Sequence, residues 1–121
     1  MPSLFEVSAG KLTGPTTGGT VTQATNKGTG VTLNAESGQI TMNNAALAAA
    51  AEVSFTVTND KIAATDVVVV NHGSAGTAGS YLVAANTIAA GSFAITVSNV
   101  SAGSLSEAIV INFVALICAS S

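Results

Sequence analysis

The chain has very few of the residues that carry charge, catalysis and stacking. Among its 121 residues there is no tryptophan and no arginine, one cysteine and one histidine, and only 7% are charged. A soluble domain usually has roughly a quarter charged residues. Because three lysines stand against six acids, the chain cannot neutralise a run of phosphates. We therefore expect no binding to nucleic acid or to an anionic membrane surface.

Long apolar segments are also missing. No stretch of about 18 apolar residues occurs, and the most apolar run, Ala108–Ala119, is interrupted by Asn112. The first ten residues lack a basic start and an apolar core, so no signal peptide is predicted. Hydrophobic residues make up 48% of the chain, which argues against disorder. A surface of small residues with so little charge predicts permanent contact with a partner.

The scarce reactive residues do not form a recognisable site. His72 has Asp66 six residues upstream, but no G-x-S-x-G motif accompanies them. We therefore expect His72 to lie at a strand end and bond to a loop. Cys118 is alone, which excludes an internal disulfide and a cysteine metal site, and we interpret it as a small buried hydrophobe. The sequence predicts neither a metal nor a cofactor.

The carboxylates and glycines do not indicate a catalytic or nucleotide-binding site either. Six acids are present: Glu6, Glu36, Glu52, Asp60, Asp66 and Glu107. A glycosidase needs two of them about 5 to 10 Å apart, which the sequence leaves open. Yet Tyr81 is the single tyrosine, and we expect it in the core or an interface. The glycines of GSAGTAG (73–79) fit neither dinucleotide nor P-loop spacing and predict a strand connection. We predict that the chain is not an enzyme.

Alternation of apolar and polar residues marks strands in the second half. Ala51–Asn59 and Ser92–Asn99 have an apolar residue at every second position, the period of a half-buried strand. Thr65–His72 is a β-branched run, which we expect to be covered on both faces. The longest strand, Glu107–Ile117, has one apolar face and a second face that includes Val110 and Val114.

The remaining predicted strands are shorter: Val21–Ala24, Val31–Asn34, Gly38–Met42 and Ser80–Ala85. The alanine-rich segment Asn43–Ala51 predicts one short helix, capped by an asparagine. About eight strands with turn signals between them predict an all-β fold, a jelly-roll-like β-sandwich. We expect an irregular N-terminal arm over residues 1–17 and a single sandwich domain over residues 18–121.

An internal similarity supports two related units. Residues 54–71 resemble residues 92–112: each has a Phe-led alternating strand that ends in an asparagine, Asn59 or Asn99. A loop, an acid and a β-branched strand follow in both. We interpret them as two strand-loop-strand units around one core, with chance similarity between strands as the alternative.

The arm contains an apolar cluster outside the strand rhythm: Leu4, Phe5, Val7 and Leu12. We predict that these residues reach across a partner subunit or a sister copy. The alternative is a disordered tail.

The stretch GGTVTQATNKGTGVTLNAESGQITMNNAALAA, with VSFTVTND, ATDVVVVNH and GSFAITVSNVSAGSLSEAIVINFVAL, resembles bacteriophage virion proteins, namely the capsid cementing (decoration) proteins of tailed phages. The resemblance covers about residues 18–116 and lies in overall pattern, without a catalytic motif. It implies a jelly-roll-like sandwich on the exterior of a virion capsid, made in the host cytoplasm. The implied partners are the major capsid protein and further copies in a homo-oligomer, a dimer or trimer.

Two other function classes stay open. A phage fibre or tail-associated receptor-binding (adhesin) domain would present exposed aromatics or ligand loops, which are scarce here. A carbohydrate-active enzyme ranks last because aromatic and arginine residues are so few. Copy number separates the first two, since hundreds of copies per particle indicate a cementing protein and a handful indicate a fibre.

Overall fold

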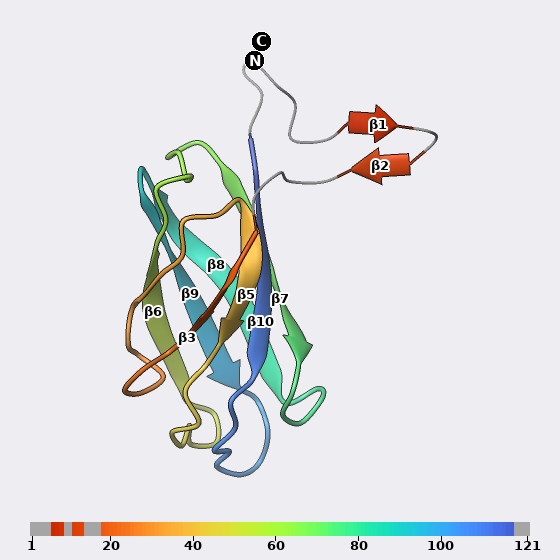
Figure 1. Ribbon diagram of the computed structural model, residues 1–121. Coiled ribbons are helices and arrows are strands. Elements are labelled where there is room, and N and C mark those ends of the chain that lie inside the picture. Colours follow the sequence, from red (N-terminus) through yellow and green to blue (C-terminus); the bar gives the residue numbers. More distant parts are fainter. Residues whose placement is uncertain (1–5, 9–10, 14–17, 118–121) are drawn as a thin grey trace.

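The computed structural model describes residues 6–8, 11–13 and 18–117 (Figure 1). Ten strands and no helix lie within these residues. Their bounds are β1 Glu6–Ser8, β2 Lys11–Thr13, β3 Thr20–Thr22, β4 Val31–Thr32, β5 Ser37–Thr41, β6 Glu52–Thr58, β7 Val67–Ser74, β8 Tyr81–Ala89, β9 Ser92–Asn99 and β10 Val110–Leu116. All eight predicted strands are present, and Ser92–Asn99 has the predicted bounds.

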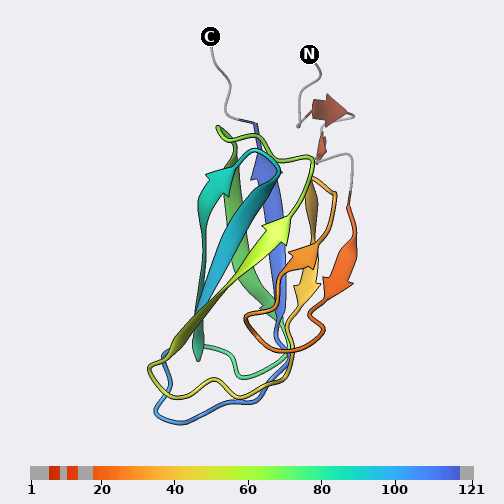
Figure 2. The same cartoon turned by 90° about the vertical axis from the view of Figure 1, so that its left-hand side faces the viewer.

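Strands β3 to β10 form a sandwich of two four-stranded sheets. One sheet has the order β3-β5-β10-β7 and is called the β10 sheet; the other has the order β4-β6-β9-β8 and is called the β9 sheet. Figure 2 views the β9 sheet with the β10 sheet behind it. The predicted all-β sandwich of about eight strands is confirmed.

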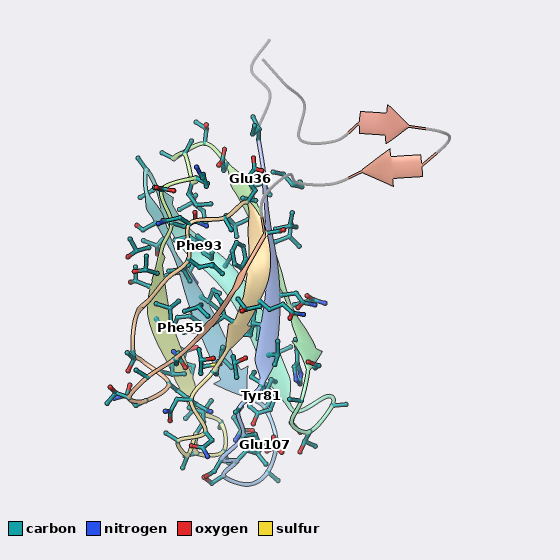
Figure 3. The ribbon with its side chains drawn as sticks, viewed as in Figure 1. Glu36, Phe55, Tyr81, Phe93 and Glu107 are labelled. Carbon is teal, nitrogen blue, oxygen red and sulfur yellow. The ribbon has the colours of Figure 1, made fainter. Side chains whose placement is uncertain are left out.

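The core lies between the sheets because strands of both alternate inward apolar residues with outward residues. On β9, Phe93, Ile95 and Val97 are at most 1% exposed. On β10 the inward residues include Phe113, whose ring centroid lies 5.5 Å from that of Phe93 in a tilted arrangement. Phe55 of β6 is also buried in this core (Figure 3). The strict alternation predicted for these strands is confirmed.

The strand order differs from the expected connectivity. A jelly roll consists of two Greek keys of antiparallel strands, whereas β3 pairs parallel with β5 and β4 pairs parallel with β6. Strands β6 to β10 instead follow the sheet order of strands B to F in an immunoglobulin-type sandwich. Strand β5 occupies the place of strand G, although it precedes β6 in the chain. Jelly-roll topology is therefore not confirmed.

The helix predicted over Asn43–Ala51 is wrong. This segment is an extended loop in which Leu47 N–H donates to Leu105 O at 2.8 Å and Leu105 N–H donates to Leu47 O at 3.0 Å. Ala50 has a φ of 61°, which a helix does not allow. A helix of about nine residues is marginal alone in water, so the backbone pairing with a distant loop outweighs the alanine propensity.

The expectation of an irregular arm is also corrected in part. Strands β1 and β2 form an antiparallel hairpin in which Glu6 is opposite Thr13, Val7 opposite Leu12 and Ser8 opposite Lys11. Residues with strand geometry therefore lie within the segment 1–17, because β1 and β2 pair along their whole length.

Strand β7 is not covered on both faces, as its β-branched run had suggested. Val67 is 50% exposed and Val69 is 49% exposed, while Val68 and Val70 pack against the core. The reason is the two-layer architecture: β7 buries one face against the β9 sheet, and none of the described strands forms a further layer over its outer face.

The internal similarity corresponds to spatially equivalent roles. Strands β6 and β9 are neighbours in one sheet, and β7 and β10 are neighbours in the other. Asn59 and Asn99 follow or end the first strand of each unit and are fully buried. Each accepts a hydrogen bond from the backbone N–H two residues further on. Each also donates to a crossing loop, Asn59 to Ala35 O at 2.6 Å and Asn99 to Leu47 O at 2.8 Å.

Candidate protein interface

The outer face of the β9 sheet is hydroxyl-rich. Its outward residues on β6 and β9 are mostly Ser and Thr, together with one acid and one alanine: Glu52, Ser54, Thr56, Thr58, Ser92, Ala94, Thr96 and Ser98. Ser54 Oγ lies 2.7 Å from Thr96 Oγ1, and Asn86 Nδ2–H donates to the same Thr96 oxygen at 2.9 Å. Over these two strands the face is well solvated and has no need of a covering partner.

The outer face of the β10 sheet is different because it is aliphatic and uncharged over its strands. Four neighbouring outward residues form what we call the apolar patch: Val67, Val69, Val114 and Leu116. Register places them together, since Val114 is opposite Val69 and Leu116 is opposite Val67. Among the other outward residues of this sheet, Val110 is also aliphatic and Gly73 has no side chain. The rest are polar but neutral: Thr20, Thr22, Ser37, Gln39, Thr41, Asn71 and Asn112.

A row of amides borders the apolar patch. Asn112 is opposite Gln39 on one side and Asn71 on the other, and Gln39 Nε2–H donates to Asn112 Oδ1 at 3.1 Å. Amides both donate and accept hydrogen bonds. A partner that covers the patch could therefore be oriented by this row.

Two acids flank the patch at the strand ends. Asp66 directly precedes β7, and its Oδ2 accepts a hydrogen bond from Ala63 N–H at 3.0 Å. Glu36 directly precedes β5, next to β10 in the sheet. The surface thus has an apolar centre with an acidic rim at one end, an arrangement that resembles the apolar core and polar rim of protein interfaces.

The patch was missed at the level of sequence, although a signal for it exists. Val110 and Val114 were assigned to the second face of their strand, and Thr65–His72 was interpreted as covered twice. Both strands are apolar on both faces, whereas their neighbours alternate with polar residues. In a two-layer sandwich the second apolar face must point outward, so the same pattern indicates an exposed apolar surface.

The predicted interface residues of the arm are only partly placed. Val7 of β1 and Leu12 of β2 are register partners in the hairpin, so the structure brings these two positions together. Leu4 and Phe5 lie outside the described residues. Among the described strands, β1 and β2 pair with each other and not with either sheet of the sandwich.

Glu107 is held in place by three hydrogen bonds to its carboxylate. It accepts hydrogen bonds from Tyr81 Oη–H at 2.8 Å, Thr77 Oγ1–H at 2.8 Å and Thr77 N–H at 3.0 Å. These bonds, with the one from Tyr81 first, hold the pKa of Glu107 below its ordinary value. Burial, assisted by the bond to Glu107, raises the pKa of Tyr81 to about 12. Both groups therefore keep their ordinary charge states near neutral pH, and Tyr81 is a core residue, as one of its predicted roles had it.

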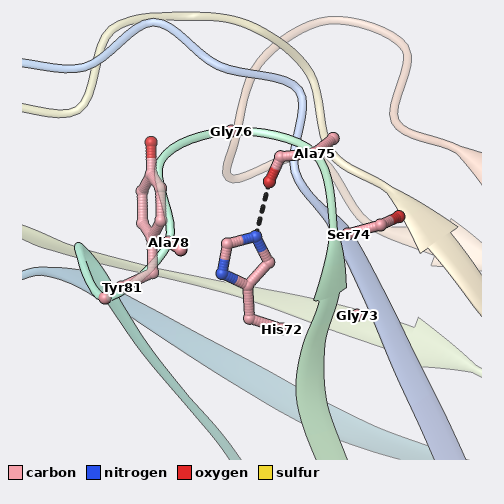
Figure 4. Close-up of a pocket in the computed structure, with 8 residues that line it drawn as sticks. His72, Gly73, Ser74, Ala75, Gly76, Ala78 and Tyr81 are labelled. Atoms are coloured by element: carbon pink, nitrogen blue, oxygen red, sulfur yellow. Dashed lines mark hydrogen bonds between the residues drawn. The ribbon is translucent and has the colours of Figure 1, made fainter.

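His72 performs the structural role that was predicted for it. Its Nε2–H donates to Ala75 O in the following loop at 2.6 Å, and its ring stands edge-on to Tyr81 at 5.5 Å (Figure 4). The two rings line a pocket of about 350 Å³ together with the end of β7 and the loop that follows it. Asp66 lies at the opposite end of β7, so no His–Asp pair forms. Gly73 belongs to β7 rather than to the loop.

Lys27 is a buried cation that sequence reasoning did not single out. Only 3% of it is exposed. Its Nζ donates to Asn43 O and, at 2.6 Å, to Glu107 O. Burial lowers the pKa of Lys27, and the charge of Glu107 opposes this shift. The contacts hold three separate segments together at one end of the sandwich, which is a structural role.

Among the described residues, no group of three or more His, Cys, Asp or Glu side chains could hold a metal ion. No helix among them has the length and apolar character needed to cross a membrane. Cys118 lies outside the described part of the chain.

Comparison with known proteins does not place the chain in a family. No protein-family model, no curated protein and no solved structure matches it. Functional inference therefore rests on the surface geometry and on the resemblance seen in the sequence.

Proposed function

We propose that this chain is a structural virion protein that binds the outer surface of a phage capsid and stabilises it by bridging major capsid protein subunits. One observation carries the proposal: an uncharged aliphatic patch stands on the outer face of a rigid sandwich, while the opposite face is hydroxyl-rich. The sequence resemblance to cementing proteins supplies the capsid as the partner.

The patch supports binding energetically. Fully burying a valine side chain contributes about 1.5–3 kcal/mol. Covering the half-exposed Val67 and Val69 would therefore contribute about 1 kcal/mol each. A ligand that binds the assembled shell and not its separate parts stabilises the shell by mass action. Repetition over a symmetric lattice multiplies a modest contribution per site. Binding alone can therefore stabilise the shell, and the protein needs no catalytic activity for this function.

The arm extends the proposal. Val7 and Leu12 are register partners in β1 and β2, and an isolated two-stranded hairpin is marginally stable in water. We infer that the hairpin, together with Leu4 and Phe5, which precede it in the sequence, contacts a capsid subunit or a sister copy. Deleting residues 2–12 is expected to lower capsid occupancy without changing the unfolding of the sandwich.

The test uses capsids that lack the protein. Purified wild-type protein is mixed with them, occupancy is measured by sedimentation and gel densitometry, and the loaded shells are heated. We expect stoichiometric binding and a raised disruption temperature. Val69→Lys should reduce occupancy at least tenfold, because it puts a charge into the centre of the patch.

The matched control is Thr56→Lys, which introduces the same charge on the hydroxyl-rich face. It should bind as the wild type does. Equal loss in both variants would mean that added charge, and not the patch, determines binding. Retention of the protein on host cells or tail assemblies, with none on capsids, would replace the proposal by the receptor-binding alternative.

A further inference from the structure

The long free edge of the β9 sheet is a second surface, independent of the apolar patch. The sheet ends on one side in β4, which has two residues, and on the other in β8, which has nine. Strand β8 (teal) lies at the left margin of the sandwich in Figure 2. A very short edge strand offers little to pair with, whereas a long edge presents a row of backbone N–H and C=O groups.

Strand β8 lacks the common protection of edge strands. Its sequence, YLVAANTIA, contains no charged residue and no proline, the two side-chain devices that usually prevent edge-to-edge pairing. Leu82 on its outer face is 64% exposed, the highest value among the exposed large hydrophobic residues described. The one irregularity of its pairing with β9 falls between Asn86 and Ala89, so residues 81–86 form a regular edge.

We propose that β8 pairs antiparallel with β8 of a second copy of this chain, across a two-fold axis, to form a continuous eight-stranded sheet. A second copy fits because the edge carries no charge, so a two-fold axis brings no like charges together. A second copy also supplies a strand of the same length as the regular edge.

The pleat restricts the register of this pairing. Opposite residues of an antiparallel pair point to the same face, and outward and inward residues alternate along β8. An outward residue must therefore meet an outward residue, which puts a residue, and not a peptide bond, on the axis. At one end, Tyr81 adjoins the loop 75–80 and its contacts with Glu107. At the other end, Thr87 has a φ of 53°.

With Tyr81 and Thr87 as the limits of the regular edge, the two-fold axis passes through Ala84. Leu82 then meets Asn86 of the second copy, and Ala84 meets its own equivalent. Ala84 is exposed and small, so no bulky side chains collide at the axis. The row Ser54–Thr96–Ala84 of one copy continues into the same row of the other.

Disulfide trapping tests the register directly. Ala84→Cys is made in a Cys118→Ser background, so that the chain's only native cysteine does not contribute. Opposite strand residues have Cα atoms about 4.5–5.5 Å apart, within the range of about 4.4–6.8 Å that a disulfide accepts. Under mild oxidation we expect most of the protein to become a covalent dimer. Ala94→Cys in the same background is the control, since Ala94 lies on the same face but one strand further in.

A second measurement does not depend on cysteine. The mass of the free protein in solution, from light scattering after gel filtration, should be twice that of the chain. Ala84→Lys should return it to the mass of one chain, because two lysines would meet on the axis. Thr56→Lys, on the central strand β6, should leave the dimer intact.

Each alternative result would overturn the proposal. A single-chain mass for the wild type at high micromolar concentration excludes the pairing. A dimer that survives Ala84→Lys and is not trapped by Ala84→Cys uses another surface. Because the experiment contains no capsid, its failure is separate from failure of the proposed function, which depends on Val69.

Discussion

The outer faces of the two sheets differ although both sheets bury similar inner faces. The β9 sheet presents Ser54, Thr56 and Thr96 on its outer face, and the hydroxyl groups of Ser54 and Thr96 are in contact. The β10 sheet presents aliphatic side chains, with Val67 and Val69 half exposed. Inner faces are constrained by folding, since the core must be apolar. Outer faces are free of that constraint, so an aliphatic outer face indicates a demand other than folding.

The largest expected effect is a difference in the free energy of unfolding between substitutions on the two faces of strand β10. Phe113 points into the core beside Phe93, so Phe113→Ala should lower the free energy of unfolding by about 3–5 kcal/mol. Its outward neighbour Val114 should behave as a surface residue, with a change for Val114→Ala within about 0.5 kcal/mol. Urea unfolding followed by circular dichroism measures both. A large loss for Val114→Ala would mean that the patch serves stability.

A smaller effect is expected when one outer face is converted toward the other. The double variant Val67→Thr, Val69→Thr replaces two patch residues by the residue type common on the β9 sheet. Because threonine also favours strands, the free energy of unfolding should change by less than about 1 kcal/mol. Capsid occupancy and binding of a hydrophobic dye should both fall. Unchanged dye binding would remove the apolar patch as an adhesive surface.

The smallest effect concerns the end of the sandwich rather than its faces. The pKa of Glu107 is lowered in the folded state, chiefly by the bond from Tyr81. A lowered folded pKa means that the carboxylate stabilises the fold above the unfolded pKa, and that this stabilisation is lost as the pH falls through the folded pKa. In Glu107→Gln the urea midpoint should vary less between about pH 5 and pH 3 than in the wild type. Parallel curves for the two proteins would contradict this.

At alkaline pH the pair of Tyr81 and Glu107 has the opposite effect: the stability of the fold decreases as the pH rises. The pKa of Tyr81 is raised to about 12, first by burial. The neutral phenol therefore stabilises the fold below the unfolded pKa near 10, and this contribution is lost as the pH rises toward 12. Tyr81→Phe serves as the control, since it cannot ionise.

The strands could be predicted from the sequence because their signal is local. Alternation in Ser92–Asn99 reports which side chains face the core, and the structure confirms it for Phe93, Ile95 and Val97. The paired units ending in Asn59 and Asn99 were visible for the same reason. The short helix was not, because the backbone of Leu47 finds its partner in Leu105, which is distant in sequence.

The candidate surface depended on information that no local pattern contains. A β-branched run such as that in β7 is compatible with a central strand or with an edge strand, and only the sheet order places β7 at an edge. Burial of Lys27 likewise depends on two carbonyl groups, of Asn43 and Glu107, that lie far from it in the chain.

The amino-acid sequence by itself determined that this protein is an all-β chain with alternating strands, a small charge and scarce catalytic side chains, since these are properties of composition and of a period of two. The tertiary structure alone decided which apolar faces are covered, which strands lie at the edges, and that Val67 meets Leu116. Those outcomes depend on pairing between strands remote in sequence, where chain topology selects one partner among several that local propensity would allow.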